Sequence, residues 1–213
     1  MLIDPETRLR AARGLGKTET AASIEVFRTM QRRGHPVSPP PLISDGWGGI
    51  REAMVEVYGT VPNYSGRGRP PTNKQPQPGW HYVQAVKQRK QGRVVGTRRR
   101  VIYGTDSAVL KQLGAHTAYV ERTHLTSRQF NSRLHRKTLG YSKAVELHRA
   151  AVVWGDSIYN FVRPLKSLRQ KDDAKLPRTW APRTPAMAAR LTDHIWTVNE
   201  LLTTVVCPGL SNT

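Results

Sequence analysis

The first 58 residues alternate between short apolar strands and amphipathic helices. Strands are predicted at Leu2-Ile3, at residues 8–13 and at residues 39–44. Helices are predicted at residues 18–33 and 50–58, where apolar side chains recur at intervals of three and four. Chains in which strands and helices alternate in this way fold into layered α/β domains. The sequence therefore predicts the α/β fold class.

The segment that follows, from Gly59 to Thr105, contains ten Lys or Arg and no Asp or Glu. Its first part, around residues 66–78, is rich in Pro and Gly, which favours an extended or mobile segment. Its second part, residues 81–103, interleaves Arg with aromatic and β-branched residues. One or two basic strands are predicted there, and two strands would form a hairpin that turns at Gly92.

The whole chain is strongly basic. It has 34 Lys and Arg against 15 Asp and Glu, a net charge of +19 and a pI of about 10.9. Such an excess attracts polyanions, of which nucleic acid is the first candidate, and the binding should weaken steeply with salt. A ribosome-like or merely cationic protein is the alternative.

Several classes of protein are disfavoured by the sequence. The single cysteine, Cys207, has no internal disulfide partner and no Cys or His at zinc-ligand spacing. No apolar run approaches the roughly 18 residues of a membrane span. The N-terminus lacks the basic and then apolar pattern of a signal peptide. A cytoplasmic protein with no membrane partner is expected.

A helix is predicted from about residue 120 to residue 139, and a second one from 142 to 162, where Pro164 stops it. The first carries one carboxylate, Glu121, near its start, and no Asp or Glu follows from Arg122 to Val145. Glu121 either stabilises the helix dipole or serves a site. One stripe of this helix is almost purely polar and positive, which predicts phosphate contact. Its members are Arg122, Thr126, Gln129, Arg133 and Arg136.

Asp45 directly follows the predicted strand at residues 39–44. The carboxyl end of a strand is where clefts of α/β proteins open, although Asp-Gly is also an ordinary turn. Gly14-Leu-Gly16-Lys17-Thr18 lacks the earlier glycine of a phosphate-binding loop, because position 11 is alanine. We expect it to end a strand and to cap the helix at residues 18–33.

Arg67-Gly68-Arg69-Pro70 has the form of an AT-hook core, in which an extended Arg-Gly-Arg lies along a narrow minor groove. Arg-Gly pairs are also common in basic linkers, where they contact phosphates without reading the groove. Both interpretations place this segment on nucleic acid.

Five short motifs occur together: Asp45-Gly-Trp, Tyr119-Val-Glu-Arg, Leu125-Thr-Ser-Arg, Arg136-Lys-Thr-Leu-Gly-Tyr-Ser-Lys and Val145-Glu-Leu-His. Thr184-Pro-Ala-Met-Ala-Ala and then Leu-Thr-Asp-His-Ile-Trp follow near the C-terminus, with Arg190 between them. Together these motifs resemble the transposases of small bacterial insertion sequences, in the family named after insertion sequence one, where glycine is usual in place of Arg190. The similarity extends from Leu2 to about Leu202.

The resemblance implies an RNase H-like fold and an Asp-Asp-Glu triad that binds two Mg²⁺ or Mn²⁺ ions. It implies cleavage and strand transfer of DNA at transposon ends and target sites, and a homo-oligomer. Asp45 then corresponds to the second Asp and Glu121 to the Glu, as catalytic residues and metal ligands. The residues expected to contact DNA are basic: Arg67, Arg69, Arg98, Arg99, Arg100, Arg122, Arg128, Arg133, Arg136, Lys137 and Lys143.

One departure from the family lies at the front of the sequence. The strand that carries the first Asp of the family would precede Leu2-Ile3-Asp4, and Asp4 matches a turn position instead. We therefore expect an incomplete transposase with negligible cleavage: a remnant gene, a mis-assigned start or half of a frameshifted pair. A non-catalytic nucleic-acid-binding protein is the alternative, which the reading frame upstream of Met1 would distinguish.

The expected organisation has two parts. Residues 1–165 would form a partial RNase H-like transposase core that lacks its first strand, with residues 59–105 as a basic insertion. Residues 166–213 would form a basic linker and a C-terminal helical extension, with short helices at about 185–190 and 192–205.

Overall fold

The computed structural model describes residues 1–66, 68–114, 117–135, 137, 139–171 and 180–204. The chain divides into two compact units, Met1–Glu6 with Arg10–Leu125, and Thr7–Leu9 with Thr126–Thr213. This division falls after Leu125, within a helix, whereas the sequence placed the end of the core at residue 165.

The first unit begins with an antiparallel pair, β1 (Leu2–Ile3) and β2 (Arg10–Ala12). The predicted turn between them is present, because the backbone N–H of Glu6 donates to the Asp4 carboxylate at 3.2 Å. Asp4 thus serves the turn, as its sequence position indicated. Leu2 lies opposite Ala12 and Ile3 opposite Arg10, and both Ile3 and Ala12 are buried.

Helix α1 (Glu19–Arg33) has the predicted bounds. The Thr18 hydroxyl accepts a hydrogen bond from the Ala21 N–H at 3.1 Å, and Gly34 ends the helix with φ 150°. A capping hydroxyl satisfies an N–H that has no partner inside the helix. On the apolar face of α1, the side chains of Val26, Phe27 and Met30 are buried.

The glycines before α1 allow a close approach of the backbone to the helix. A Cβ built on Gly14 would lie 1.8 Å from the carbonyl oxygen of Ala22, and one on Gly16 would lie 2.7 Å from the Ala22 nitrogen. Only glycine fits at such distances. The Gly-Leu-Gly-Lys-Thr segment therefore caps α1, as the sequence predicted, and its two glycines also pack against that helix.

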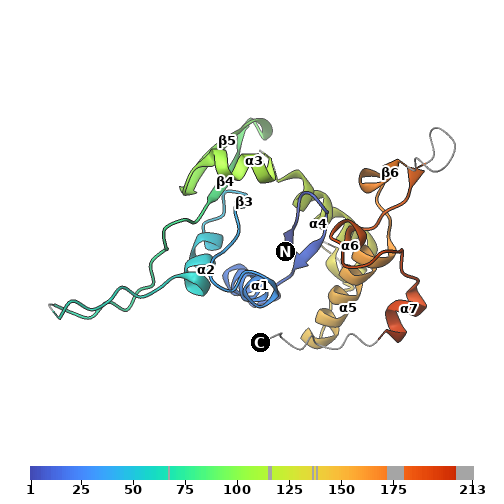
Figure 1. The fold of residues 1–213 in the computed structure, drawn as a ribbon, viewed down its shortest axis with the longest axis horizontal. Coiled ribbons are helices and arrows are strands. Elements are labelled where there is room, and N and C mark those ends of the chain that lie inside the picture. Colours follow the sequence, from blue (N-terminus) through green and yellow to red (C-terminus); the bar gives the residue numbers. More distant parts are fainter. Residues whose placement is uncertain (67, 115–116, 136, 138, 172–179, 205–213) are drawn as a thin grey trace. The chain divides into compact units, whose positions relative to one another are not determined.

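The larger sheet consists of β3 (Leu42–Ser44), β4 (Tyr82–Lys90) and β5 (Arg93–Tyr103), in the order β3-β4-β5 (Figure 1). β3 and β4 are parallel, with Leu42 opposite Tyr82, and helix α2 (Gly49–Tyr58) lies between them in sequence. β4 and β5 form the predicted antiparallel hairpin. The unit is therefore a mixed α/β structure, which confirms the fold class at this level.

The core of this unit joins α1, α2 and the base of the hairpin. Tyr58, Trp80 and Tyr103 form a row of edge-to-face aromatic contacts, with centroids 6.5 Å and 5.5 Å apart. Phe27 of α1 meets Tyr58 in the same geometry at 6.3 Å. Offset and edge-to-face contacts are favourable beyond the area they bury. This row fixes the start of β4 against both helices.

The Pro/Gly-rich segment leaves the core and returns to it. Thr60 and Gln75 exchange two backbone hydrogen bonds, of 3.1 Å and 2.9 Å, which close the base of the excursion. Lys74 forms an ion pair of 3.0 Å with Glu56 of α2 at the same place. Figure 1 shows the segment between α2 and β4 as a long extension.

Two helices differ from the sequence prediction. Helix α3 (Asp106–Leu113) was not predicted, and α4 (Ala118–Phe130) ends nine residues before the expected residue 139. Asn131 ends it, because its side chain accepts from the Arg133 N–H at 3.1 Å and begins a 3-10 turn at Ser132. Asn favours such local bonds over a helix interior. The prediction of one continuous helical stripe from residue 122 to residue 136 is therefore wrong.

The second unit contains α5 (Val145–Ser157), which continues as a π-helical turn through Val162, close to the predicted bounds. The short strands Gln170–Lys171 and Trp180–Ala181 pair antiparallel. α6 (Pro185–Ala188) and α7 (Val198–Thr203) are shorter than predicted. A capping box of Thr197 and Glu200 starts α7 six residues after the expected start.

His194 precedes α7 and is held by two carboxylates. It contacts Asp193 and Glu200 at 2.6 Å each and stacks on Trp196. The hydrogen bond to Asp193 is the largest cause that raises the pKa of the imidazole, and the hydrogen bond to Glu200 is the second.

No helix among the described residues is long and apolar enough to cross a membrane.

Candidate functional site

Asp45 lies in the turn that follows β3. Its carboxylate accepts a hydrogen bond from the Trp47 N–H at 3.3 Å. This bond confirms that Asp45-Gly46 forms a turn. The turn is held from β4, because the Gln84 amide donates to the Trp47 carbonyl at 3.1 Å and to the Tyr82 hydroxyl at 3.0 Å. Asp45 itself stays exposed at the end of the strand.

Glu121 lies in the first turn of α4. Its carboxylate accepts from the Lys87 ammonium at 2.5 Å and from the Thr117 hydroxyl at 3.1 Å. The hydrogen bond from Lys87 is the largest cause that lowers the pKa of Glu121, with smaller contributions from Thr117 and His124. A charged partner stabilises the ionised form of a carboxylate.

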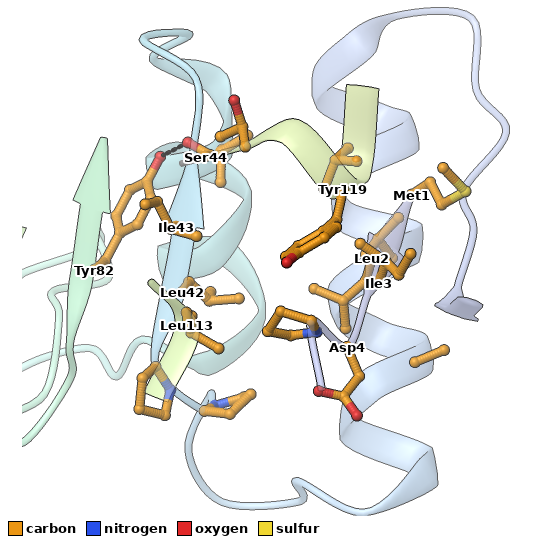
Figure 2. A pocket seen from close by; sticks show the side chains of 18 of the residues that line it. Met1, Leu2, Ile3, Asp4, Leu42, Ile43, Ser44, Tyr82, Leu113 and Tyr119 are labelled. Atoms are coloured by element: carbon orange, nitrogen blue, oxygen red, sulfur yellow. Dashed lines mark hydrogen bonds between the residues drawn. The ribbon is translucent and has the colours of Figure 1, made fainter. Parts of the chain in front are cut away.

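Asp45 and Glu121 line the same cavity, of about 480 Å³. Figure 2 shows Leu2 and Ile3 of β1 opposite Leu42 and Ile43 of β3, with the Tyr119 ring between them. Among the described residues β1 pairs only with β2, and β3 only with β4. The cavity thus lies between two small sheets. Most of its wall is apolar, and three acidic residues line it: Asp4, Asp45 and Glu121.

The two carboxylates provide fewer ligands than a two-metal site requires. Mg²⁺ prefers six oxygen ligands in octahedral geometry, and paired metal ions need several carboxylates. Within the described parts of the chain, no group of three His, Cys, Asp or Glu is placed to hold a metal ion. Asp45 and Glu121 alone therefore do not fit a complete two-ion site, and the metal remains a prediction.

Two residues beside Glu121 were not singled out by the sequence. Lys87 on β4 is 34 residues away in sequence, and His124 lies one helical turn further along α4 and lines the cavity. Lys87 belongs to a basic strand, where a lysine has no local sign of an acidic partner. Only the i, i+3 spacing of Glu121 and His124 offered a signal.

Replacing Lys87 by glutamine is expected to raise the pKa of Glu121 toward its ordinary value. A carboxylate whose pKa is lower in the folded than in the unfolded protein stabilises the fold at pH values above the unfolded pKa. This stabilisation is lost as the pH falls through the folded pKa. The variant should therefore lose less stability on acidification than the parent. NMR titration of the Glu121 carboxyl measures the shift.

Lys90→Gln is the matched control for this titration. Lys90 is on the same strand, is exposed, and has no carboxylate partner among the described residues. An unchanged Glu121 pKa is expected. Equal shifts in the two variants would mean that the general field of the basic strand, and not the Lys87 contact, holds the pKa down.

The basic residues predicted to bind DNA lie on different elements. Arg98, Arg99 and Arg100 lie on β5 and are exposed, as is Arg69 in the Pro/Gly-rich segment. Arg122 lies on α4 within the first unit. The second unit carries Arg128, Arg133, Lys137 and Lys143, whereas Arg67, Arg136 and Cys207 lie outside the described residues.

β5 provides the largest concentration of exposed basic side chains in the first unit. Three consecutive arginines, Arg98 to Arg100, are paired across the ladder with Val86, Ala85 and Gln84 of β4. None of the three has a carboxylate partner among the described residues. Like charges placed together without counter-charges repel, which favours an anionic partner.

The arrangement thus combines the two predicted carboxylates, Asp45 and Glu121, on one cavity with a separate basic strand in the same unit. Carboxylates at a strand end and a helix start suit metal or proton chemistry, and exposed arginines suit phosphates. Comparison of the chain with models of protein families, with curated proteins and with solved structures finds no match.

Proposed function

We propose that this chain is a DNA-binding core of a transposition enzyme, with an RNase H-like fold. The observation that carries the proposal is the meeting of Asp45 and Glu121 on one cavity, although 75 residues of sequence separate them. These are the two carboxylates to which the resemblance gives the second and third places of the triad. No local sequence pattern predicted that these two carboxylates would line the same cavity.

The order of elements supports the proposal. An antiparallel pair is followed by a helix, a strand, a second helix and a strand parallel to the one before it. An RNase H-like sheet would join β1 to β3 through one further strand, and the cavity lies between these two strands. The enzyme class implies a cytoplasmic bacterial setting, DNA as partner and a homo-oligomer.

Charge supports DNA as the partner. The chain carries a net charge of +19, and β5 exposes three arginines in a row. Arginine binds phosphate with a rigid fork of donors and stays charged at all physiological pH. Binding of duplex DNA through several such contacts should be tight at low salt and weak at high salt.

Cleavage by this chain alone is expected to be negligible. A supercoiled plasmid incubated with the chain and Mg²⁺ or Mn²⁺ should bind and remain uncut. Among the described residues no three potential ligands are grouped to hold a metal ion, and Lys87 already pairs with Glu121. Gel shift measures the binding and conversion to open circles measures the nicking. Metal-dependent nicking that disappears in Glu121→Ala would overturn the expectation that the site is incomplete.

A second candidate is a nucleic-acid-binding protein that has no metal site. The Lys87–Glu121 ion pair favours it, because an ammonium occupies the carboxylate that a metal would need. Broadening of NMR signals by Mn²⁺ separates the two candidates. Loss of signal at both Asp45 and Glu121 that is abolished by Asp45→Asn supports the transposase-type site, and no broadening supports the second candidate.

A further inference from the structure

The outer half of the β4–β5 hairpin extends beyond the core. Tyr82 to Ala85 are buried, but every residue of the segment 87–100 is exposed except Gly96, which is half-buried. The ladder continues through the Lys90–Arg93 pair, so residues 87–97 form a two-stranded ribbon and not a loose loop. Arg98, Arg99 and Arg100 pair with Val86, Ala85 and Gln84, where the hairpin meets the core. We name residues 87–100 the distal hairpin.

The distal hairpin has a high positive charge. It contains no Asp or Glu, and Lys87 is its one residue with a carboxylate partner among the described residues. Seven side chains are basic: Lys87, Arg89, Lys90, Arg93, Arg98, Arg99 and Arg100. A ribbon with this charge is stabilised by a polyanion that follows its length.

Basic side chains point to both faces of the ribbon. Successive strand residues alternate between faces, so Arg89 and Lys90 lie on opposite faces of β4, as do Arg98 and Arg99 on β5. A ribbon lying in a groove of duplex DNA has a phosphate backbone on either side. Arginines on both faces match two phosphate walls, whereas binding to one flat anionic surface would use one face.

The width and the tip select the groove. The major groove of B-DNA, about 12 Å wide, admits a two-stranded ribbon, and the minor groove, about 6 Å wide, does not. The hairpin turns tightly through two residues. Gln91 and Gly92 have φ of 49° and 80°, and a two-residue type I′ turn requires a positive φ at both positions. The tip is therefore no wider than the ribbon.

An irregularity near the tip exposes apolar side chains. The register shifts between Gln88 and Arg89, which oppose Gly96 and Val94, so Val95 is the extra residue of a bulge. Val94 and Val95 are 50% and 63% exposed. Bulges increase the twist of a ribbon, and apolar side chains contact the methyl group of thymine, which faces the major groove.

We propose that the distal hairpin inserts into the major groove of double-stranded DNA. The proposal rests on the proposed function, that the chain binds DNA. It assigns the groove and the element that enters it. It also separates the hairpin from the Arg-Gly-Arg segment, whose AT-hook form suits the minor groove.

The test measures binding of the full chain to a fluorescein-labelled 30-base-pair duplex over a range of salt. The triple variant R98A/R99A/R100A removes three charges from the hairpin. It is expected to weaken binding roughly 100-fold and to reduce the slope of log K against log salt by about 2.7. Thermal melting of the variant checks that its fold is kept, since all three side chains are exposed.

The matched control is K17A/R28A/R32A, which removes the same charge from exposed residues on and beside α1. A change of less than fivefold is expected. Methyl green, a major-groove ligand, should displace the parent chain from the duplex, and distamycin, a minor-groove ligand, should not.

Several outcomes would overturn the inference. Equal losses in the two triple variants would show that only net charge matters. Displacement by distamycin alone would place the chain in the minor groove. A parent chain that fails to bind duplex DNA at low salt would contradict the proposed function itself, which distinguishes that failure from a failure of the hairpin inference.

Discussion

Replacing Trp80 by alanine is expected to lower the free energy of unfolding by about 3–5 kcal/mol. The Trp80 side chain is 2% exposed and lies between the rings of Tyr58 and Tyr103. The substitution removes its transfer free energy and leaves a cavity that the rigid aromatic neighbours fill poorly. Urea denaturation of the full chain, followed by fluorescence and by circular dichroism, measures the loss.

Trp80→Phe is the control for this substitution. The Trp80 indole N–H is buried with no hydrogen-bond partner among the described residues, so phenylalanine keeps most of the ring and removes an unsatisfied donor. A loss of less than about 1.5 kcal/mol is expected. Equally small losses for alanine and phenylalanine would mean that the aromatic row does not hold the base of the hairpin.

Replacing Gly14 by alanine is expected to lower the free energy of unfolding by about 3 kcal/mol. The new Cβ would meet the main-chain carbonyl of Ala22 at 1.8 Å, and no side-chain rotation can relieve a contact with backbone. The loop would have to leave α1, which would strain the hydrogen bond of 2.7 Å from the Leu15 N–H to Glu25. Thermal melting should show a fall of roughly 10 °C.

Gly48→Ala is the matched control in the same unit. Gly48 has helical dihedral angles, φ −70° and ψ −28°, and a Cβ there would have no neighbour within 4 Å. A change within about 0.5 kcal/mol is expected. A Gly14 variant as stable as the Gly48 variant would contradict the close approach of this loop to α1.

Most local elements of the first unit were predictable. Thr18 and Gly34 mark the ends of α1 in the sequence, and Gly92 marks the turn of the basic hairpin. These signals work because a cap or a positive φ is a property of one or two residues. α3 was missed because its eight residues are bounded by a long basic segment that was assigned to strands and linkers.

The error in α4 has a different cause. The helical pattern continues past Phe130, but the Asn131 side chain offers the backbone a local alternative and ends the helix. Whether an Asn inside a periodic segment caps or stays helical depends on competing interactions of similar size. The predicted stripe therefore failed at its end, although Glu121 and Arg122 lie on the helix as expected.

The candidate site was predictable only as a list of residues. Asp45 and Glu121 were named from their positions on a strand end and a helix start and from the family resemblance, and the structure brings both to one cavity. Lys87 could not be named, since its contact with Glu121 joins a strand and a helix 34 residues apart. Long-range pairs of this kind depend on packing.

The net charge, the helix caps, the basic hairpin and the α/β class could be read from the sequence, because they follow from residue type and from short-range periodicity. Only the folded chain shows that Asp45 and Glu121 line one cavity, that Lys87 pairs with Glu121 and that the arginines of β5 are exposed. These features depend on distances between segments far apart in the chain, which the packing of the whole unit sets and no local propensity encodes.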